Sequence, residues 1–247
     1  MINTPLVEAI FEIRWELERQ ENKPPMDTNY KIFLGRFFDR ISKDYPHHVT
    51  LPSSNMPDEI SAYIIQHQFR IDKDKWPLIQ VGQGITTLNY TESYEWDDFK
   101  ERAKGLIRTL FELYPDSKKL KINSLILRYI NGIKFNYERD DVITFLKKIH
   151  CDAKMSEQFF TVTGAQKESK GFNFIFVHPS IHPVGQIITH YGRGMLKNND
   201  AIIWEMGVQS EGMNTPNIQN DVMKWLNEAH DIPHNWYKSI KEEIGRE

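Results

Sequence analysis

The stretch Pro77-Leu-Ile-Gln-Val-Gly-Gln-Gly-Ile-Thr-Thr-Leu-Asn89 combines strand-forming residues with two glycines, Gly82 and Gly84. Glycine inside a strand is typical of a bulge or of a close approach by another part of the backbone. A phosphate-binding loop is the alternative, but no helix follows the glycines directly and no Lys-Ser/Thr pair accompanies them. We therefore predict one bulged strand over 78–90 that closes a structural unit just before a long helix.

The long helix is predicted over 96–114, because apolar residues recur there at steps of three and four. Upstream, apolar and charged residues alternate over 6–17, which predicts a half-buried strand of an antiparallel sheet. The segment 29–45 has helical spacing, 47–59 is typical of a loop, and 60–71 predicts another strand. The first half thus has the order strand, helix, two strands, long helix.

The second half has a similar order of elements. Its predicted segments are a strand over 120–135, a short helix over 142–149, strands over 159–166, 172–178, 185–191 and 201–209, and a helix over 217–230. Pro233 interrupts the helical pattern, and a last helical piece follows with Trp236, Ile240 and Ile244. The fold class is therefore α+β, with two related units, 1–117 and 118–247, packed as one body. Each unit is a curved antiparallel sheet on a long helix, in a TATA-binding-protein-like or helix-grip-like arrangement. Residue identity between the halves is low, so the internal duplication rests on element order.

Composition restricts the class of protein. The 247 residues are 40% hydrophobic, enough for a sizeable core, and no apolar run reaches the length of a membrane-spanning helix. The single Cys151 fits a reducing compartment, and the first residues lack a signal-peptide pattern, so we expect a cytoplasmic protein. A net charge of -3 disfavours nucleic acid as a partner.

Four sequence blocks keep their order along the chain: Pro5-Leu-Val-Glu-Ala-Ile-Phe-Glu-Ile-Arg-Trp15, Leu78 to Tyr90, Arg128-Tyr-Ile-Asn131 and Trp225-Leu-Asn-Glu-Ala-His-Asp-Ile232. Together they resemble a sporadically distributed family of uncharacterised bacterial proteins. The chain departs from the family pattern at Gln83 and Trp236, where proline and phenylalanine are expected. The resemblance implies a grouping at the level of the fold and no catalytic residues. The patchy distribution of such a family is compatible with a mobile or defence-associated system.

Arg128 and Asn131 are polar residues in a strand that otherwise has a buried pattern. A buried charge needs a partner, which a glutamate on a neighbouring strand could supply: Glu8, Glu12 or Glu205. The alternative is that Arg128 anchors a ligand on the concave face of the sheet. Arg193, between two glycines at a predicted strand end, has the same ambiguity between a turn residue and an anion contact.

Three histidines lie near predicted strand ends: His178, His182 and His190. If they converge they could form a catalytic or metal cluster, but a proline-defined turn with polar histidines explains the same pattern. His230 and His234 have helical spacing, which Pro233 between them makes unreliable. We therefore predict no metal and no cofactor, and list Arg128, Asn131, His178, His182, His190 and Arg193 as candidate ligand-binding residues.

No nucleophile–base pair, carboxylate dyad or phosphate loop stands out in this sequence. The best functional interpretation is a non-enzymatic cytosolic binding protein whose partner is another protein. A small-ligand or nucleotide binder that uses the concave face of the sheet is the alternative, and a metal-assisted hydrolase is the least favoured.

Overall fold

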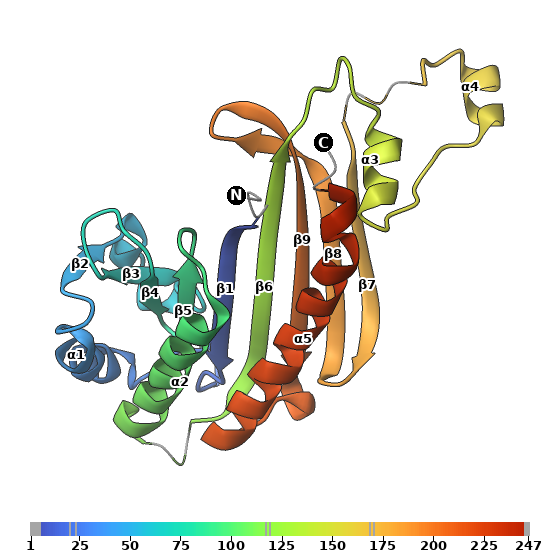
Figure 1. Ribbon diagram of the computed structural model, residues 1–247. Helices are drawn as coiled ribbons and strands as arrows, with labels where there is room; N and C mark the ends of the chain where they lie inside the picture. Colours follow the sequence, from blue (N-terminus) through green and yellow to red (C-terminus); the bar gives the residue numbers. More distant parts are fainter. Residues whose placement is uncertain are drawn as a thin grey trace.

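The computed structural model describes residues 6–19, 21–22, 24–116, 118, 120–167, 169 and 171–244. Its centre is an antiparallel sheet in the strand order β2-β3-β4-β5-β1-β6-β9-β8-β7 (Figure 1). The strands are β1 (Leu6–Trp15), β2 (His47–Thr50), β3 (Ile65–Arg70), β4 (Leu78–Gly82), β5 (Ile85–Tyr90), β6 (Ile122–Lys134), β7 (Asn173–Ile181), β8 (Val184–Leu196) and β9 (Asn199–Glu211). The helices are α1 (Tyr30–Ile41), α2 (Trp96–Leu113), α3 (Val142–Lys148), α4 (Glu157–Thr163) and α5 (Gln219–Ile244). The predicted α+β class is confirmed.

The two halves of the chain share one sheet, because β1 pairs with β6 along nearly its whole length. Phe11 lies opposite Leu127 in this pairing, and both side chains are fully buried. The alternation predicted for 6–17 is confirmed, since Ala9, Phe11, Ile13 and Trp15 alternate with less buried residues. The seam between the halves is therefore a hydrogen-bonded strand pair and not a linker.

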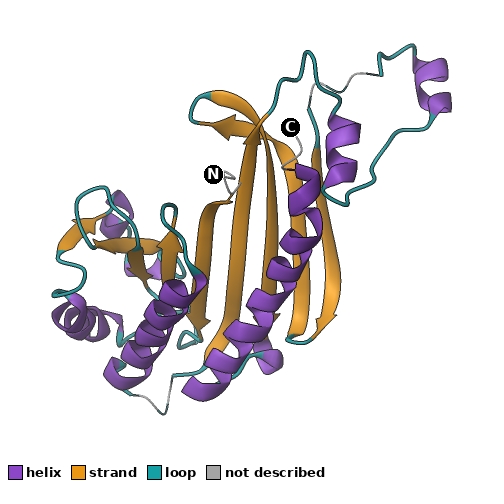
Figure 2. Ribbon diagram, viewed as in Figure 1, coloured by secondary structure: helices purple, strands orange, loops and turns teal. Residues whose placement is uncertain are grey.

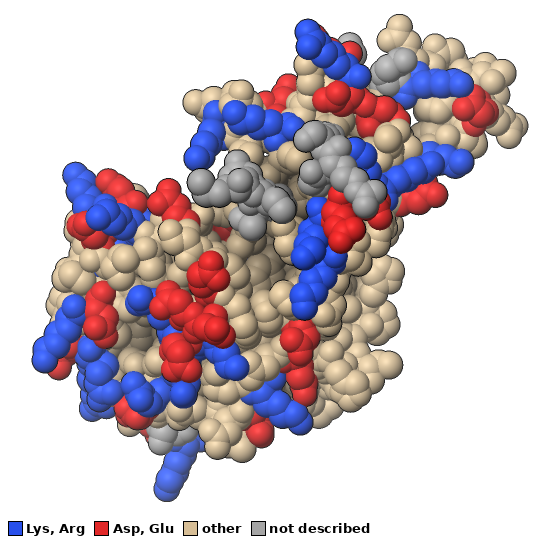
Figure 3. Space-filling view, viewed as in Figure 1, with Lys and Arg blue, Asp and Glu red and all other residues tan. Residues whose placement is uncertain are grey.

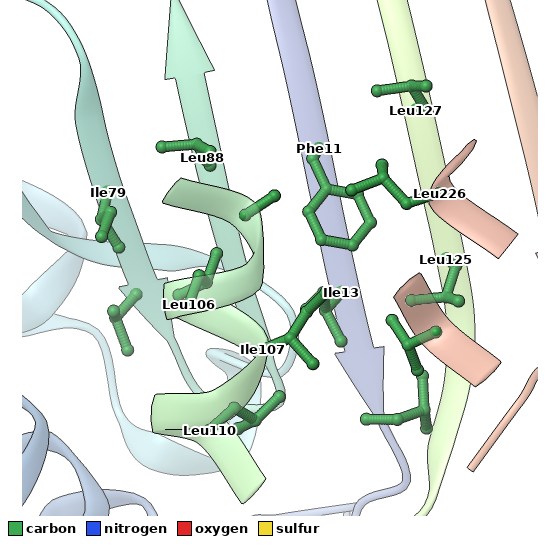
Figure 4. Close-up of a cluster of buried hydrophobic side chains, with 14 of the residues drawn as sticks. Phe11, Ile13, Ile79, Leu88, Leu106, Ile107, Leu110, Leu125, Leu127 and Leu226 are labelled. Atoms are coloured by element: carbon green, nitrogen blue, oxygen red, sulfur yellow. The ribbon is translucent and has the colours of Figure 1, made fainter. Parts of the chain in front are cut away.

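The main core lies between one face of the sheet and helices α2 and α5, which lie side by side across it (Figure 2). Figure 4 shows side chains of β1, β6 and both helices meeting there, among them Phe11, Ile107 and Leu226. Phe11 also lies 6.3 Å from the Trp225 ring of α5, measured between ring centroids. Full burial of each such side chain stabilises the fold by about 1.5–3 kcal/mol. We call the opposite face of the sheet the open face.

The bulged strand predicted over 78–90 is a hairpin of two strands, so that prediction is wrong. Gly82 lies opposite Ile85, and Gln83 and Gly84 form a two-residue turn in which Gly84 has a φ of +79°. Of the two features that a glycine in a strand indicates, a bulge or a close approach of the backbone, the structure has the close approach at Gly82. A Cβ on Gly82 would lie 2.0 Å from the carbonyl oxygen of Ile64. The register irregularity itself lies in the pairing of β3 with β4.

Three further predictions need correction. The segment 159–166 is not a strand, because helix α4 ends there with Gly164 in the left-handed conformation and its N–H bonded to the carbonyl of Phe160. Helix α5 continues through Pro233, whose burial offsets the hydrogen bond that proline removes. The loop predicted over 47–59 contains β2 and two short 3₁₀ turns, at Pro52–Asn55 and Asp58–Ile60, and β3 begins only at Ile65.

Within the described residues, the helices are all too short or too polar to span a bilayer.

Candidate functional site

Strand β7 is an edge of the sheet, and its apolar side chains are exposed on both faces. Ile175 is 61% exposed and Val177 is 52% exposed, both on the open face, whereas Phe176 is exposed on the helix face. At the turn into β8, Ile181 is 75% exposed and Val184 is also exposed. We call these five side chains the apolar edge.

The hairpin that carries the apolar edge has no charge. From Gly171 to Gly192 the sequence contains no Asp, Glu, Lys or Arg, although these residues make up 26% of the chain. Figure 3 shows no blue or red side chains on the lower part of the flank where Figure 1 places β7. Natural proteins commonly protect exposed edge strands with charges, lysine especially. The edge at β7 lacks that protection.

Aromatic contacts hold β7 to the rest of the sheet. Phe172 and Phe174 pack against the second core cluster, with their ring centroids 5.6 Å apart. Phe176 meets the ring of buried Tyr191 edge-on, with centroids 6.3 Å apart. Aromatic and β-branched residues favour strands, which explains why this segment forms a strand. Its outer side has no protein neighbour among the described residues.

Alternate backbone groups of β7 point away from the sheet. The N–H of Arg193 on β8 donates to the carbonyl of Phe172 at 3.3 Å, and Phe174 and Phe176 follow in the same phase of the ladder. In an antiparallel pair, the residues between such positions direct their N–H and C=O groups to the other side. Ile175 and Val177 therefore present free donors and acceptors along the outer edge.

A projecting arm, the described residues of 154–171, adds more exposed apolar surface next to β7. Figures 1 and 2 show the arm, with α4 at its tip, extending beyond the body of the molecule. Helix α4, all of whose residues are described, buries none of them, and Val162 is 77% exposed. Among the described residues fourteen large hydrophobic side chains are exposed, and eight of them lie between Met155 and Val184.

Two of the sequence-predicted residues, Arg128 and His190, meet on the open face. Arg128 forms a two-pronged ion pair with Glu205, with N–O distances of 2.7 and 3.1 Å. His190 lies directly opposite Glu205 and hydrogen-bonds to Asn173. This geometry favours the interpretation of Arg128 as an ion-pair residue, and Glu205 is one of the partners that the sequence suggested.

The other predicted residues lie elsewhere. Asn131 is buried on the helix face opposite Trp204. Arg193 also belongs to the helix face, where it bonds to Asp200 at 2.8 Å and its guanidinium carbon lies 4.3 Å from the centre of the Tyr137 ring. His178 lies opposite Ile187 on the helix face, and His182 lies in the turn between β7 and β8. The strand register thus places His178 and His190 on opposite faces, so the predicted histidines do not share one site.

An aromatic network that includes His230 lies at the junction of the two halves. The hydroxyls of Tyr94 and Tyr129 lie 2.7 Å apart, and the Tyr129 hydroxyl lies 2.8 Å from Nδ1 of His230. The rings of Trp96 and His230 stack with centroids 3.6 Å apart. Burial lowers the pKa of His230 to about 4, so this imidazole is neutral at pH 7. Its partners are internal, which favours a structural role.

Helix α5 also brings the ring of His234 to 5.0 Å from that of His230. The described residues nevertheless contain no group of three or more His, Cys, Asp or Glu side chains that could hold a metal ion. A cavity of about 790 Å³ opens beside Arg193, and its lining includes Lys134, Asp140 and Asp200. Because its charges are of both signs, the cavity does not single out one class of ligand.

A scan of protein-family models and a search of curated proteins find no match to this chain. The apolar edge was not predicted from the sequence, because only the strand order makes β7 an edge strand. The signal that could have found it is the charge-free run from Gly171 to Gly192.

Proposed function

We propose that this protein acts by binding another protein through the apolar edge and the arm, without catalysing a reaction. The observation that carries the proposal is the concentration of exposed apolar side chains on one unpaired edge strand and the arm beside it. Contiguous apolar patches on soluble proteins commonly mark interaction sites. An open strand edge adds backbone groups that an extended segment of a partner can pair with.

Energetics support the same interpretation. Removing apolar surface from water stabilises a complex by about 25 cal/mol per Å² before the entropic cost of association. Ile175, Val177 and Ile181 are each more than half exposed, so a partner that covers them gains this term at several neighbouring positions. No charged side chain of the hairpin has to be desolvated in the process.

The test compares Val177→Lys with Ile32→Lys as baits in the native host. The two side chains have matched exposure, 52% and 53%, but Ile32 lies on α1 far from the edge. Tagged baits are purified from cells that keep the untagged chromosomal copy, and the retained proteins are identified by mass spectrometry. We expect Val177→Lys to lose partners that wild type and Ile32→Lys retain. Equal retention by all three baits would contradict the proposal.

A small-ligand or nucleotide binder on the open face is the second candidate. It is supported by the guanidinium side chain of Arg128, which is 36% exposed although it is paired with Glu205. Polar groups continue across this face, where Asn89 donates to Glu8 at 2.9 Å. Binding of a nucleotide panel that Arg128→Gln abolishes would favour this candidate, and identical thermal shifts for both proteins would count against it. The metal-assisted hydrolase remains the least favoured.

A finer description of the fold belongs with these proposals. We propose that 1–117 and 118–247 are duplicated units in a TATA-binding-protein-like or helix-grip-like arrangement. It is supported by the strand orders β1-β5-β4-β3 and β6-β9-β8-β7, and by the long helix, α2 or α5, that follows each set. Membership of the sporadically distributed bacterial family, a cytoplasmic location and a defence-associated context also remain proposals.

A further inference from the structure

We propose that the partner of the apolar edge is a second copy of this chain, paired through β7 in an antiparallel manner about a twofold axis. This inference rests on the proposed function and names its partner. The dimer would join two sheets edge to edge into one continuous sheet.

The backbone of β7 selects the register. Outward-pointing groups belong to Asn173, Ile175, Val177, Pro179 and Ile181, and Pro179 has no N–H to donate. An axis at Ile175 pairs Ile175 with its own copy and Asn173 with Val177 of the other copy. Each of these pairs can exchange two hydrogen bonds, and Pro179 is left outside them. An axis at Val177 would instead pair Pro179 with Ile175 and lose a bond on each side.

The side chains of β7 are compatible with this symmetry. A twofold axis brings each residue near its own copy, so a charged residue close to the axis would face a like charge. No charged residue occurs between Gly171 and Gly192. In the register centred on Ile175, Phe174 of one copy lies opposite Phe176 of the other on the helix face. The two copies of Ile175 meet on the open face, and in the single chain this side chain is 61% exposed.

The same register accounts for the arm and the hairpin turn. Asn173, the first residue of β7, lies level with Val177 of the other copy, so the rest of β7 and its turn extend past the point where the other copy's arm leads into β7. The turn of one copy, with exposed Ile181 and Val184, is thereby carried to the base of the other copy's arm. The arm exposes Met155, Phe159 and Val162, which are apolar as well. The apolar turn of one copy and the apolar arm of the other would then cover each other.

Disulfide trapping tests the register. On a Cys151→Ser background, Ile175→Cys places two thiols at the axis, where Cα atoms of a hydrogen-bonded antiparallel pair are about 5.5 Å apart and within disulfide reach. Ile181→Cys is the matched control on the same strand, because its copies would lie about 40 Å apart at ~3.3 Å per residue. We expect oxidation to yield a species of twice 29.2 kDa for Ile175→Cys and not for Ile181→Cys. Cross-linking of both variants to the same extent would overturn the register.

Sedimentation equilibrium of the unmodified chain tests for the dimer without relying on the folding of the cysteine variants. We expect wild type and Ile32→Lys to be dimers at micromolar concentration, and Ile175→Lys to be a folded monomer. A monomeric wild type up to about 100 μM, where an interface this specific should associate, overturns self-pairing. If Val177→Lys still loses another protein from the host in that case, the proposed function stands without the dimer; if it loses nothing, both are wrong.

Discussion

Gly84 is the residue on which the hairpin between β4 and β5 depends. Its φ of +79° disfavours any L side chain, and a Cβ there would lie 2.7 Å from Leu17 and 2.9 Å from Tyr63. We predict that Gly84→Ala lowers the free energy of unfolding by about 1–2 kcal/mol from backbone strain alone. Gly35→Ala is the control, because Gly35 lies in α1 and no atom lies within 4 Å of the added Cβ. This substitution should raise the free energy of unfolding by about 0.5–1 kcal/mol. Urea unfolding measures both, and equal effects would contradict the assignment.

His230 makes stability depend on pH at the junction of the two halves. Burial lowers its folded pKa from 6.5 to about 4, with smaller contributions from His234 and Lys100 that Asp231 opposes. Between these values the unfolded chain binds a proton that the folded chain does not, so stability is lost as pH falls from about 6.5 to 4. We predict a loss of about 3 kcal/mol over this window that is absent in His230→Gln. Carboxylates titrate in both proteins and cancel in the comparison.

The measurement is urea unfolding at pH 7 and at pH 4. His234→Gln serves as the control, because His234 is exposed. This variant should still lose most of the free energy of unfolding that the wild type loses between pH 7 and pH 4. A wild type and a His230→Gln variant that lose the same free energy would show that burial does not hold His230 neutral.

At the scale of elements, strongly periodic segments were predictable and irregular ones were not. The strand at 6–17 and the helix at 96–114 were predicted within a few residues, since each has one buried face. The hairpin at Gln83-Gly84 was missed because nearly every residue of both strands is buried, so no alternation of apolar and charged residues marks where one strand ends. The continuity of α5 was missed because the burial that holds Pro233 in place is a tertiary effect.

The arm contributes no buried residue of α4 to the folded monomer. Helix α4 buries no residue, so replacing residues 155–166 with a short Gly-Ser linker should change the free energy of unfolding by less than about 1 kcal/mol. The measurement uses an Ile175→Lys background, in which dimerisation cannot add to stability. In the wild-type background the same deletion should weaken the dimer, as measured by its dissociation on dilution. A large loss of monomer stability would mean that the arm packs on the body.

At the scale of the whole molecule, predicting the candidate site requires knowing which face of the sheet each side chain occupies. Side chains alternate along a strand, so residues close in sequence can end on opposite faces. Asn131 was separated from Arg128 in this way along β6, and the register of β7 with β8 places His178 and His190 on opposite faces. Only the ion pair of Arg128 with a glutamate was predictable, because a half-buried charge needs a partner. The apolar edge results from the strand order, which places β7 last.

The most direct measurement of the central claim is hydrogen exchange at individual amides of β7. In the dimer the outward N–H groups of Ile175 and Val177 should be protected at high protein concentration, and the protection should fall on dilution or in Ile175→Lys. The inward N–H groups of Phe174 and Phe176 should stay protected throughout, because β8 binds them in the monomer. Fast exchange of Ile175 and Val177 at every concentration, with Phe174 and Phe176 still protected, would show that no second copy pairs with this edge.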